Sequence, residues 1–386
     1  MPSNGCAGRT KQKEINSIEI PKTYYGEGCY KAIINELKNK NCDKILIIIS
    51  LSIENMDIMK ELLKILDENT ISYDIYKKPS GEPTIGTIGK MMHNVCHKNK
   101  ADAIIAIGGG STIDLAKIVS VINRTVSPLQ TLSNIIDTKK VITEISKTTL
   151  FVLPTTGSGS EATDISIVKN NSGEKVALID PLLLPDIVLL DPLWTLTLPQ
   201  SIIASTGLDA LSHAIEAHIS KKKTYMTKTF SSYSINLISS NLLQSITNPN
   251  KINNREKLMI GTFYAGIADK HAGVGLIHAL SYPLQDLYEI PHSIAVSLFL
   301  KFVLEEYYGD FVDHIDEDIL IRCIEVINRC MNFTGYRNYL IKLRNRLNLD
   351  RMVASCLKRE RLLINNPWPI SKSQIKNIYK KWSEVI

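Results

Sequence analysis

The chain has 386 residues, of which 44% are apolar and 22% are charged, the composition of an ordinary globular protein. Such a length is typical of two or three domains. No apolar run approaches the roughly 18 to 20 residues that a membrane-spanning helix needs, which excludes an integral membrane protein. The N-terminal segment is polar and predicts no secretory signal. The seven scattered cysteines include no CxxC pair, which predicts a reducing, cytoplasmic location.

The net charge of +6 is concentrated at the C-terminal end of the chain. Residues 336–386 contain twelve lysines and arginines against three acidic residues. A basic face of this kind can meet nucleic acid or an anionic substrate. Because no DNA- or RNA-binding motif accompanies the charge, we expect a solvated helical surface and no nucleic-acid partner.

The first half of the sequence alternates short β-branched runs with helical patterns. Continuous apolar runs suit strands buried on both faces of a parallel sheet. A helical pattern at residues 56–66 separates the first two runs. This alternation predicts an α/β nucleotide-binding domain. The predicted strands are residues 45–49, 103–107, 151–153, 176–179 and 187–190.

The hydrophobic pattern changes after residue 192. Long amphipathic stretches follow, and no segment there predicts a clear strand. We therefore predict an α/β domain over residues 1–192 and a helical domain over residues 193–386. The predicted helices of the second domain include residues 204–219, 229–246, 254–268, 317–332 and 371–385.

Three successive glycines, residues 108–110, follow a predicted strand directly and open a helix through Ser111 and Asp114. Glycines let a ligand approach the backbone, and a helix N-terminus presents unpaired N–H groups to an anion. The pattern is neither the GxGxxG fingerprint nor a P-loop. We expect a pyrophosphate here, although a tight turn that requires glycine would leave the same pattern.

A second loop, PTTGSGSE at residues 154–161, follows the strand predicted at residues 151–153. Ligands of open α/β sheets bind at the carboxyl ends of the strands, where this loop would lie. Alone it could be an ordinary polar loop. Together with the glycine loop, it indicates a second wall of one cofactor cleft.

Four metal-ligand side chains are spread over the second half of the chain. Asp209 and His213 are four residues apart and would share one face of a helix, which in isolation indicates only a helical pair. His278 and His292 follow, and one carboxylate with three imidazoles suits Fe²⁺ or Zn²⁺ with a position left open for substrate.

These motifs together resemble the iron-dependent (group III) alcohol dehydrogenase family, within the dehydroquinate-synthase-like superfamily. That family carries GGGSxxDxAK, PTTxGTGSE, DALxH and two histidines fourteen residues apart. This sequence has a counterpart of each motif, in the same order. The likeness runs from about Tyr25 to Pro367 and covers nearly the whole chain.

The resemblance implies a nicotinamide dinucleotide, NAD(H) or NADP(H), on the α/β domain and Fe²⁺ or Zn²⁺ on the helical domain, with the active site between them. Homologous proteins are commonly dimers or larger, so a homo-oligomer is expected. By position in the motifs, the cofactor-binding residues would be Gly109, Gly110, Ser111, Asp114, Thr155, Thr156 and Lys175, and the metal ligands would be Asp209, His213, His278 and His292.

Three departures from the family pattern bear on particular roles. Many members have a histidine where this chain has Tyr282, and a hydroxyl with a pKa near 10 is a poorer proton relay than imidazole. We hypothesise that Tyr282 is catalytic and hydrogen-bonds substrate or ribose. The second loop is one residue shorter than usual, which would shift its contacts. Ser50 and Ser52 stand where a carboxylate would hold the ribose of NAD, so NADPH is slightly favoured.

The activity implied by the resemblance is the reversible reduction of a small aldehyde to a primary alcohol. Residues 278–292 and Asn365-Asn366-Pro367 resemble phosphonoacetaldehyde reductases, whose product is 2-hydroxyethylphosphonate. Residues 272–275 resemble general alcohol dehydrogenases instead and lack a lysine expected against a phosphonate. Alternatives are a glycerol-dehydrogenase-like or other reaction of the superfamily and, from another class, a non-catalytic nucleotide- or nucleic-acid-associated protein.

Overall fold

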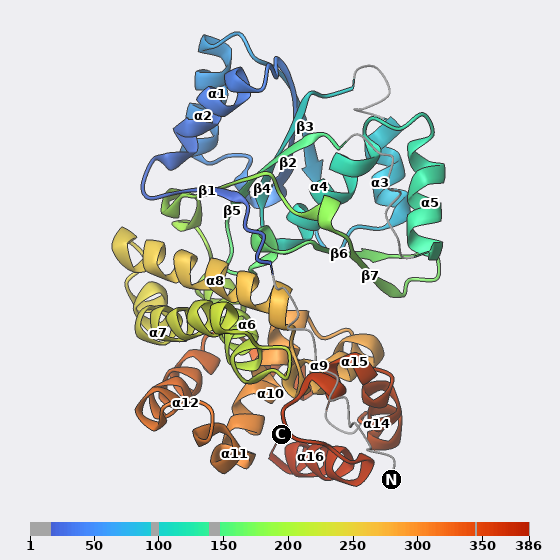
Figure 1. Cartoon of the computed structure of the whole chain (residues 1–386), viewed down its shortest axis with the longest axis vertical. Coiled ribbons are helices and arrows are strands. Elements are labelled where there is room, and N and C mark those ends of the chain that lie inside the picture. The colour runs from blue at the N-terminus through green and yellow to red at the C-terminus, as the bar shows by residue number, and fades with distance from the viewer. Residues whose placement is uncertain (1–16, 94–99, 139–146, 344–345, 386) are drawn as a thin grey trace, which may run out of the picture.

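The structure, a computed structural model, describes residues 17–93, 100–138, 147–343 and 346–385. An N-terminal domain with a six-stranded sheet stands above a C-terminal domain of helices in Figure 1. This arrangement confirms the predicted fold class. Strand β8 ends at Leu190 and helix α6 begins at Gln200. The boundary at residue 192 stays a prediction.

The large sheet has the strand order β1-β8-β5-β4-β2-β3, and every neighbouring pair is parallel. The four central strands contain the apolar runs that the sequence predicts. The two edge strands were not predicted, because an edge strand needs no continuous apolar run. The strands are β1 (Lys22–Tyr25), β2 (Lys44–Ser50), β3 (Ser72–Lys78), β4 (Ala103–Gly108), β5 (Thr149–Pro154) and β8 (Ile187–Leu190).

The run at residues 176–179 forms a strand, but its predicted place in the parallel sheet is wrong. It lies in β7 (Lys175–Ile179), which pairs antiparallel with β6 (Ile165–Lys169) in a separate ribbon. Ile179 is 44% exposed, whereas the central strands are buried on both faces. A run of four apolar residues does not distinguish these two settings. The ribbon borders the interdomain cleft described below.

Helices cover both faces of the sheet (Figure 1). Alternate side chains of β2 point to opposite faces: Ile47 packs with α1 and α2, and Ile48 packs with α3, α4 and α5. Coverage on both faces explains why the central strands are apolar throughout. These helices are α1 (Ala32–Asn39), α2 (Asp57–Glu68), α3 (Ile85–Met91), α4 (Gly110–Ile122) and α5 (Pro128–Thr138).

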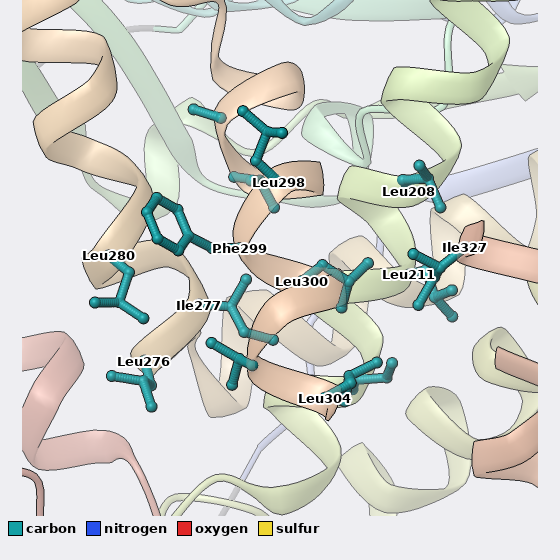
Figure 2. Close-up of a cluster of buried hydrophobic side chains, with 14 of the residues drawn as sticks. Leu208, Leu211, Leu276, Ile277, Leu280, Leu298, Phe299, Leu300, Leu304 and Ile327 are labelled. Carbon is teal, nitrogen blue, oxygen red and sulfur yellow. The ribbon is translucent and has the colours of Figure 1, made fainter. Parts of the chain in front are cut away.

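Helix α6 (Gln200–Ile219) runs through the centre of the helical domain. The sequence predicts this helix, but fifteen of its residues are buried, so it is enclosed by helices and not amphipathic. Its Leu208 and Leu211 lie in one apolar cluster with side chains of α9 (Leu276–Tyr288), α10 (His292–Glu306) and α12 (Glu317–Met331), as Figure 2 shows. The segment that carries Asp209 and His213 is therefore held rigidly by its packing.

The other predicted helices form with ends shifted by a few residues. Helices α9 and α10 were not singled out from the sequence, where Pro283 interrupts one and Pro291 precedes the other. Among the described residues, no helix is both long and apolar enough to cross a membrane. The remaining helices are α7 (Tyr225–Thr247), α8 (Ile252–Ala272), α11 (Tyr308–Val312), α13 (Tyr336–Leu343), α14 (Leu349–Leu357), α15 (Glu360–Asn365) and α16 (Lys372–Val385).

Candidate active site

A large cleft lies between the two domains. The N-terminal domain contributes the start of α4, the loop after β5 and the β6–β7 ribbon to its lining. The C-terminal domain contributes side chains from α6, α9 and α10 and from the segment around α14 and α15. Most of the residues predicted to bind cofactor or metal therefore lie on the two sides of one cleft.

The glycine loop forms the N-terminal end of α4. Gly109 is the N-cap residue, with no side-chain cap, and the helix begins at Gly110. A Cβ at Gly109 would lie 3.0 Å from Oγ1 of Thr156, so the two loops approach each other closely here. Gly110, Ser111 and Asp114 line the cleft. The first N–H groups of α4 thus stand beside the cleft without a capping side chain, as an anion site requires.

Asp114 and Lys117 connect the two loops from within the protein. The hydroxyl of Ser160 donates a hydrogen bond to Oδ1 of Asp114 over 3.0 Å, and burial raises the pKa of Asp114 to about 6. The ammonium of Lys117 donates to the carbonyl oxygens of Ser160 and Ile165, both at 2.7 Å, and burial lowers its pKa to about 8. Their hydrogen bonds hold the relative position of the loops.

Thr155, Thr156 and Lys175 occupy different positions around the cleft. Thr155 is buried and faces a smaller pocket behind the loop, not the main cleft, whereas Thr156 borders both. Lys175 opens β7 and lines the cleft. Its ammonium pairs with Glu82 at 2.5 Å. Of these three predicted cofactor contacts, Thr155 is the one placed away from the main cleft.

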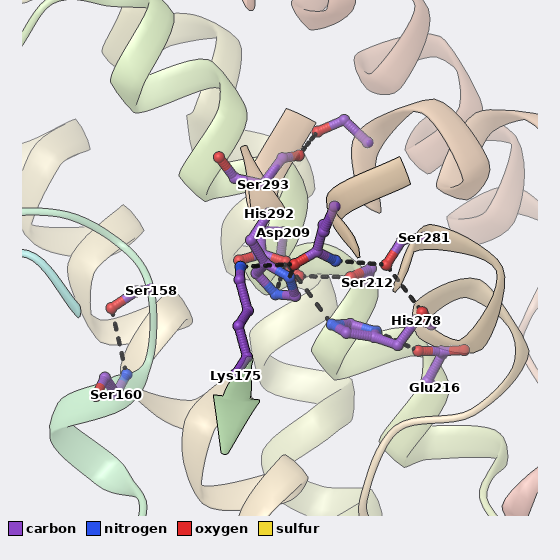
Figure 3. A network of polar contacts seen from close by, with 12 residues as sticks. Ser158, Ser160, Lys175, Asp209, Ser212, Glu216, His278, Ser281, His292 and Ser293 are labelled. Atoms are coloured by element: carbon purple, nitrogen blue, oxygen red, sulfur yellow. Dashed lines mark hydrogen bonds and ion pairs between the residues drawn. The ribbon is translucent and has the colours of Figure 1, made fainter. Parts of the chain in front are cut away.

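The four predicted metal ligands converge from three helices, and Figure 3 shows three of them, Asp209, His278 and His292. Asp209 and His213 share a face of α6, His278 lies on α9, and His292 is the first residue of α10. One ligand atom from each lies within 4.8 Å of all the others. Oδ1 of Asp209 is 3.5 Å from Nε2 of His292 and 3.8 Å from Nε2 of His278. The turn between α9 and α10 therefore brings His292 back beside the ligands on α6 and α9.

The unsatisfied atoms of this cluster fit a divalent cation. Oδ1 of Asp209, Nδ1 of His213 and Nε2 of His278 are buried without a hydrogen-bond partner among the described residues. Buried polar atoms are normally paired, and a cation would satisfy all three. Burial raises the pKa of Asp209 to about 6, so an ionised carboxylate here favours a nearby cation. Burial and the neighbouring charges hold the pKa of His292 well below its usual value, which keeps a lone pair available.

Two residues that the sequence analysis missed support these histidines. Oε2 of Glu216 lies 2.6 Å from Nδ1 of His278, and its other oxygen accepts the backbone N–H of Ile277. Oε1 of Gln285 lies 3.1 Å from Nδ1 of His292. Such partners orient the ligating ring. Each stands seven positions after a predicted ligand of its own helix, but that spacing places it on the ligand's face of the helix without marking it as the partner of a histidine on another helix or turn.

Tyr282 lines the cleft beside the cluster, with its ring centre 6.4 Å from that of His292. The guanidinium of Arg359 lies 4.3 Å from the centre of the tyrosine ring and also pairs with Asp286 at 2.6 Å. Burial raises the pKa of Tyr282 above its usual value, so its hydroxyl stays protonated at neutral pH. Tyr282 therefore lines the cleft with a protonated hydroxyl, next to a metal-ligand candidate and an arginine.

Comparisons with known proteins cover both domains. Residues 21–192 match the family model "Iron-containing alcohol dehydrogenase", and residues 203–383 match "Fe-containing alcohol dehydrogenase family, C-terminal". A 4-hydroxybutyrate dehydrogenase of Clostridium kluyveri is 31% identical over 323 residues, which cover 78% of this chain and 84% of that protein. A sulfoacetaldehyde reductase of Bilophila wadsworthia is 27% identical over 378 residues, which cover 92% of this chain and 96% of that protein.

Solved structures share the fold. The sulfoacetaldehyde reductase of Bifidobacterium kashiwanohense, solved in complex with NAD⁺, superposes with a TM-score of 0.84 at 23% identity, covering 97% of this chain and all of that one. An iron-containing alcohol dehydrogenase of Thermotoga maritima superposes with a TM-score of 0.74 at 26% identity. The match covers 96% of this chain and 100% of that one. With both domains matched and the predicted ligands converging in one cleft, the chain belongs to the iron-containing alcohol dehydrogenase family of enzymes.

Proposed function

We propose that this enzyme interconverts a small aldehyde and its primary alcohol with a nicotinamide dinucleotide and a divalent metal, Fe²⁺ or Zn²⁺. Asp209, His213, His278 and His292 would hold the metal. The observation that carries the proposal is the convergence of these four ligands, three of them with buried unpartnered atoms, in the cleft that also contains the start of α4. We further propose a cytoplasmic homo-oligomer, in keeping with the scattered cysteines and the expectation drawn from homologous proteins.

The two domains contribute different parts of the chemistry. A bound divalent cation supplies Lewis acidity toward a carbonyl oxygen, and the nicotinamide supplies or accepts the hydride. Gly110 and the first N–H groups of α4 would bind the pyrophosphate, and Ser111, Asp114, Thr156 and Lys175 would border the cofactor further along. Thr155 would act from behind the loop. The chain thus positions the two reactants and excludes water from between them.

The hydroxyl of Tyr282 would complete this arrangement by donating a hydrogen bond to the substrate oxygen or the ribose. Since burial raises its pKa, the hydroxyl would orient its partner and not transfer its own proton at neutral pH. A solvent-derived proton would then reach the alkoxide by another route. Tyr282 therefore has a role in binding and orientation.

For the substrate, we propose an aldehyde with an anionic group, specifically phosphonoacetaldehyde. Arg351, Lys358, Arg359 and Arg361 line the part of the cleft formed by the C-terminal segment, where Asp286 pairs with Arg359. Nε of Arg359 is buried without a hydrogen-bond partner among the described residues. The side chain as a whole is 34% exposed, and the guanidinium of an arginine can bind a phosphonate or sulfonate oxygen. The relative named for sulfoacetaldehyde supports an anionic substrate of this size.

For the cofactor, we propose NADPH over NADH. Ser50 ends β2 and its hydroxyl lies 3.1 Å from that of Ser52, so two neutral groups stand where a carboxylate would repel a 2′-phosphate. The nearest acidic residue along the chain, Glu54, already forms an ion pair with Lys77. NADH remains a usable cofactor in this arrangement, since nothing at Ser50 excludes a free 2′-hydroxyl.

The purified enzyme tests these assignments directly. Metal content is measured first, and absorbance at 340 nm is then followed with NADH or NADPH and acetaldehyde, sulfoacetaldehyde or phosphonoacetaldehyde. We expect about one metal ion per chain, faster oxidation of NADPH and the highest kcat/KM with phosphonoacetaldehyde. A chain without metal that reduces none of the aldehydes would contradict the function, whereas equal activity on acetaldehyde would contradict only the anionic substrate.

Substitution of Arg359 by methionine sharpens the substrate test. The change keeps a long apolar side chain over Tyr282 but removes the charge. We expect kcat/KM for phosphonoacetaldehyde to fall about tenfold to a hundredfold, the equivalent of one charged hydrogen bond of roughly 1.5–3 kcal/mol. The value for acetaldehyde should hardly change. An equal loss for both aldehydes would show that Arg359 supports the site in general.

A further inference from the structure

We propose that Gln285 is a positioning residue that selects the tautomer of His292 and, through Lys175, connects the metal ligands to the cofactor domain. The inference rests on the proposed metal centre. Gln285 is on α9 of the helical domain and is 5% exposed, whereas Lys175 belongs to β7 of the N-terminal domain. Figure 3 shows Lys175 extending from its strand toward His292 and Asp209.

The contacts of Gln285 determine which way its amide points. Nζ of Lys175 lies 3.4 Å from the amide, and because an ammonium can only donate, it must face the oxygen Oε1. On the other side, Nε2 of Gln285 lies 3.2 Å from the hydroxyl of Ser281. That hydroxyl donates its own proton to the carbonyl of His278, so it can accept one from the amide. Both neighbours therefore require the same orientation.

This orientation selects one tautomer of His292. Oε1 of Gln285 is an acceptor and lies 3.1 Å from Nδ1 of His292, so Nδ1 must carry the proton. The unprotonated Nε2 then faces the cluster, 3.5 Å from Oδ1 of Asp209. A flipped amide would present its NH₂ group to Nδ1 and favour the opposite tautomer, which cannot ligate through Nε2. Lys175 prevents that flip from the other domain.

The support of His278 does not depend on the orientation of an amide. His278 donates from Nδ1 to the carboxylate of Glu216, which has no donor face and needs no orienting partner. Glu216 also belongs to the helical domain. The support of His292 is therefore the one that depends on the position of the N-terminal domain. Glu82 in turn fixes the ammonium of Lys175 by an ion pair at 2.5 Å.

The test measures Zn²⁺ affinity of the metal-free full chain by competition with a chromophoric chelator, in the absence of dinucleotide. We expect Gln285→Leu to weaken binding about 10- to 100-fold, as loss of a ligand's orienting partner does. Gln285→Glu, which keeps an acceptor for both Lys175 and His292, should restore most of the affinity. Lys175→Met should cost less than Gln285→Leu, because the amide remains and Ser281 still favours its orientation.

The double variant decides whether the two residues act in series. Because the proposed route from Lys175 to the orientation of His292 runs through Gln285, the variant carrying both Lys175→Met and Gln285→Leu should bind Zn²⁺ no more weakly than Gln285→Leu alone. Additive losses would overturn the inference, as would wild-type affinity in Gln285→Leu. If the wild-type chain binds no Zn²⁺, the proposed metal centre itself falls, and this inference with it.

Two controls separate orientation from general damage. Gln244→Leu changes an exposed glutamine of α7 in the same domain and should leave the affinity at the wild-type value. Thermal unfolding of each metal-free variant reports on folding. A Gln285→Leu protein that unfolds well below the wild type, and whose affinity Gln285→Glu does not restore, would make Gln285 a structural residue and overturn the proposal.

Discussion

The two walls of the cleft present different kinds of chemical group. Around the start of α4 the N-terminal wall presents mainly backbone: glycines, short loops and the first N–H groups of the helix. The C-terminal wall presents side chains that project from the helices α6, α9 and α10. A backbone wall fits the phosphates of a cofactor by its shape, and a side-chain wall supplies the specific donor atoms that a metal requires.

This difference teaches where each wall is vulnerable. In the backbone wall, an added side chain occupies space that the ligand or the neighbouring loop needs, so the damage is steric and local. In the side-chain wall, a change of one atom removes a ligand while the helix keeps its packing. Apart from Lys175, whose side chain reaches Gln285 of the opposite wall, substitutions in the two walls should therefore affect different measurements. The predictions below are ordered from the largest expected effect to the smallest.

Asp209→Asn should have the largest effect. The amide keeps the shape of the carboxylate but lacks its charge, so the cluster loses its only anionic ligand. We expect bound metal to be lost and kcat to fall by about 10³-fold or more, roughly 4 kcal/mol of transition-state stabilisation. Fluorescence titration should give an unchanged affinity for NADPH. A variant with wild-type metal content and near-normal kcat would break the comparison on the side-chain wall.

Gly110→Val tests the backbone wall in the opposite sense. A Cβ at Gly110 would lie 3.1 Å from the hydroxyl of Ser158, and a branched side chain would fill the entrance to the α4 N-terminus. We expect the affinity for NADPH to fall about tenfold to a hundredfold, or roughly 1.4 to 2.8 kcal/mol, with metal content unchanged. Titration and metal analysis on the same sample check both. Loss of metal together with cofactor binding would show that the walls are not independent.

Glu161→Gln addresses the stability of the loop behind the backbone wall. Glu161 is fully buried, its oxygens lack hydrogen-bond partners among the described residues, and burial raises its pKa to about 7. Because the folded pKa exceeds the unfolded value, the folded state binds more protons between about pH 4.5 and 7, and wild-type stability falls as pH rises through that window.

The neutral amide removes this pH dependence. The Glu161→Gln variant should therefore have a stability near the wild-type value at pH 4.5 and a higher one at pH 8, by an amount on the order of 2 kcal/mol. Thermal unfolding of both proteins at the two pH values measures the difference. The same shift in Tm at both pH values would contradict a titrating Glu161.

Tyr282→Phe should have the smallest effect, because only one hydroxyl is lost and the ring keeps its contact with Arg359. If Tyr282 hydrogen-bonds substrate or ribose, kcat should fall roughly two- to tenfold, the value of a hydrogen bond of about 0.5–1.5 kcal/mol. Metal content and cofactor affinity should stay the same. A kcat and pH profile identical to the wild type would remove Tyr282 from the mechanism.

The parts of the site that depend on neighbouring residues could be predicted from the sequence. The spacing of Asp209 and His213 placed both side chains on one helical face, and the glycine run placed a helix N-terminus after a strand. The prediction was wrong where the position of a strand depends on the elements packed around it. The run at residues 176–179 has the composition of a core strand, yet its place in a half-buried ribbon depends on β6, which the sequence did not reveal.

Residues in supporting roles were also out of reach. Glu216 and Gln285 have the periodicity of their helices, but glutamate and glutamine are common on helix surfaces, and nothing in the sequence marks them as buried partners of histidines. Thr155 shows the reverse case, since its motif suggests a direct cofactor contact and its side chain faces the smaller pocket behind the loop.

The sequence by itself determined the two-part architecture, the glycine-lined helix start and the identity of the four candidate ligands, because strand and helix periodicity and motif spacing are properties of neighbouring residues. Only the tertiary structure decided that His292 returns to His278 across the α9–α10 turn, and that Lys175 reaches Gln285 from the other domain. Those contacts join residues far apart in the chain, and their geometry is fixed by the packing of whole elements, which no local pattern encodes.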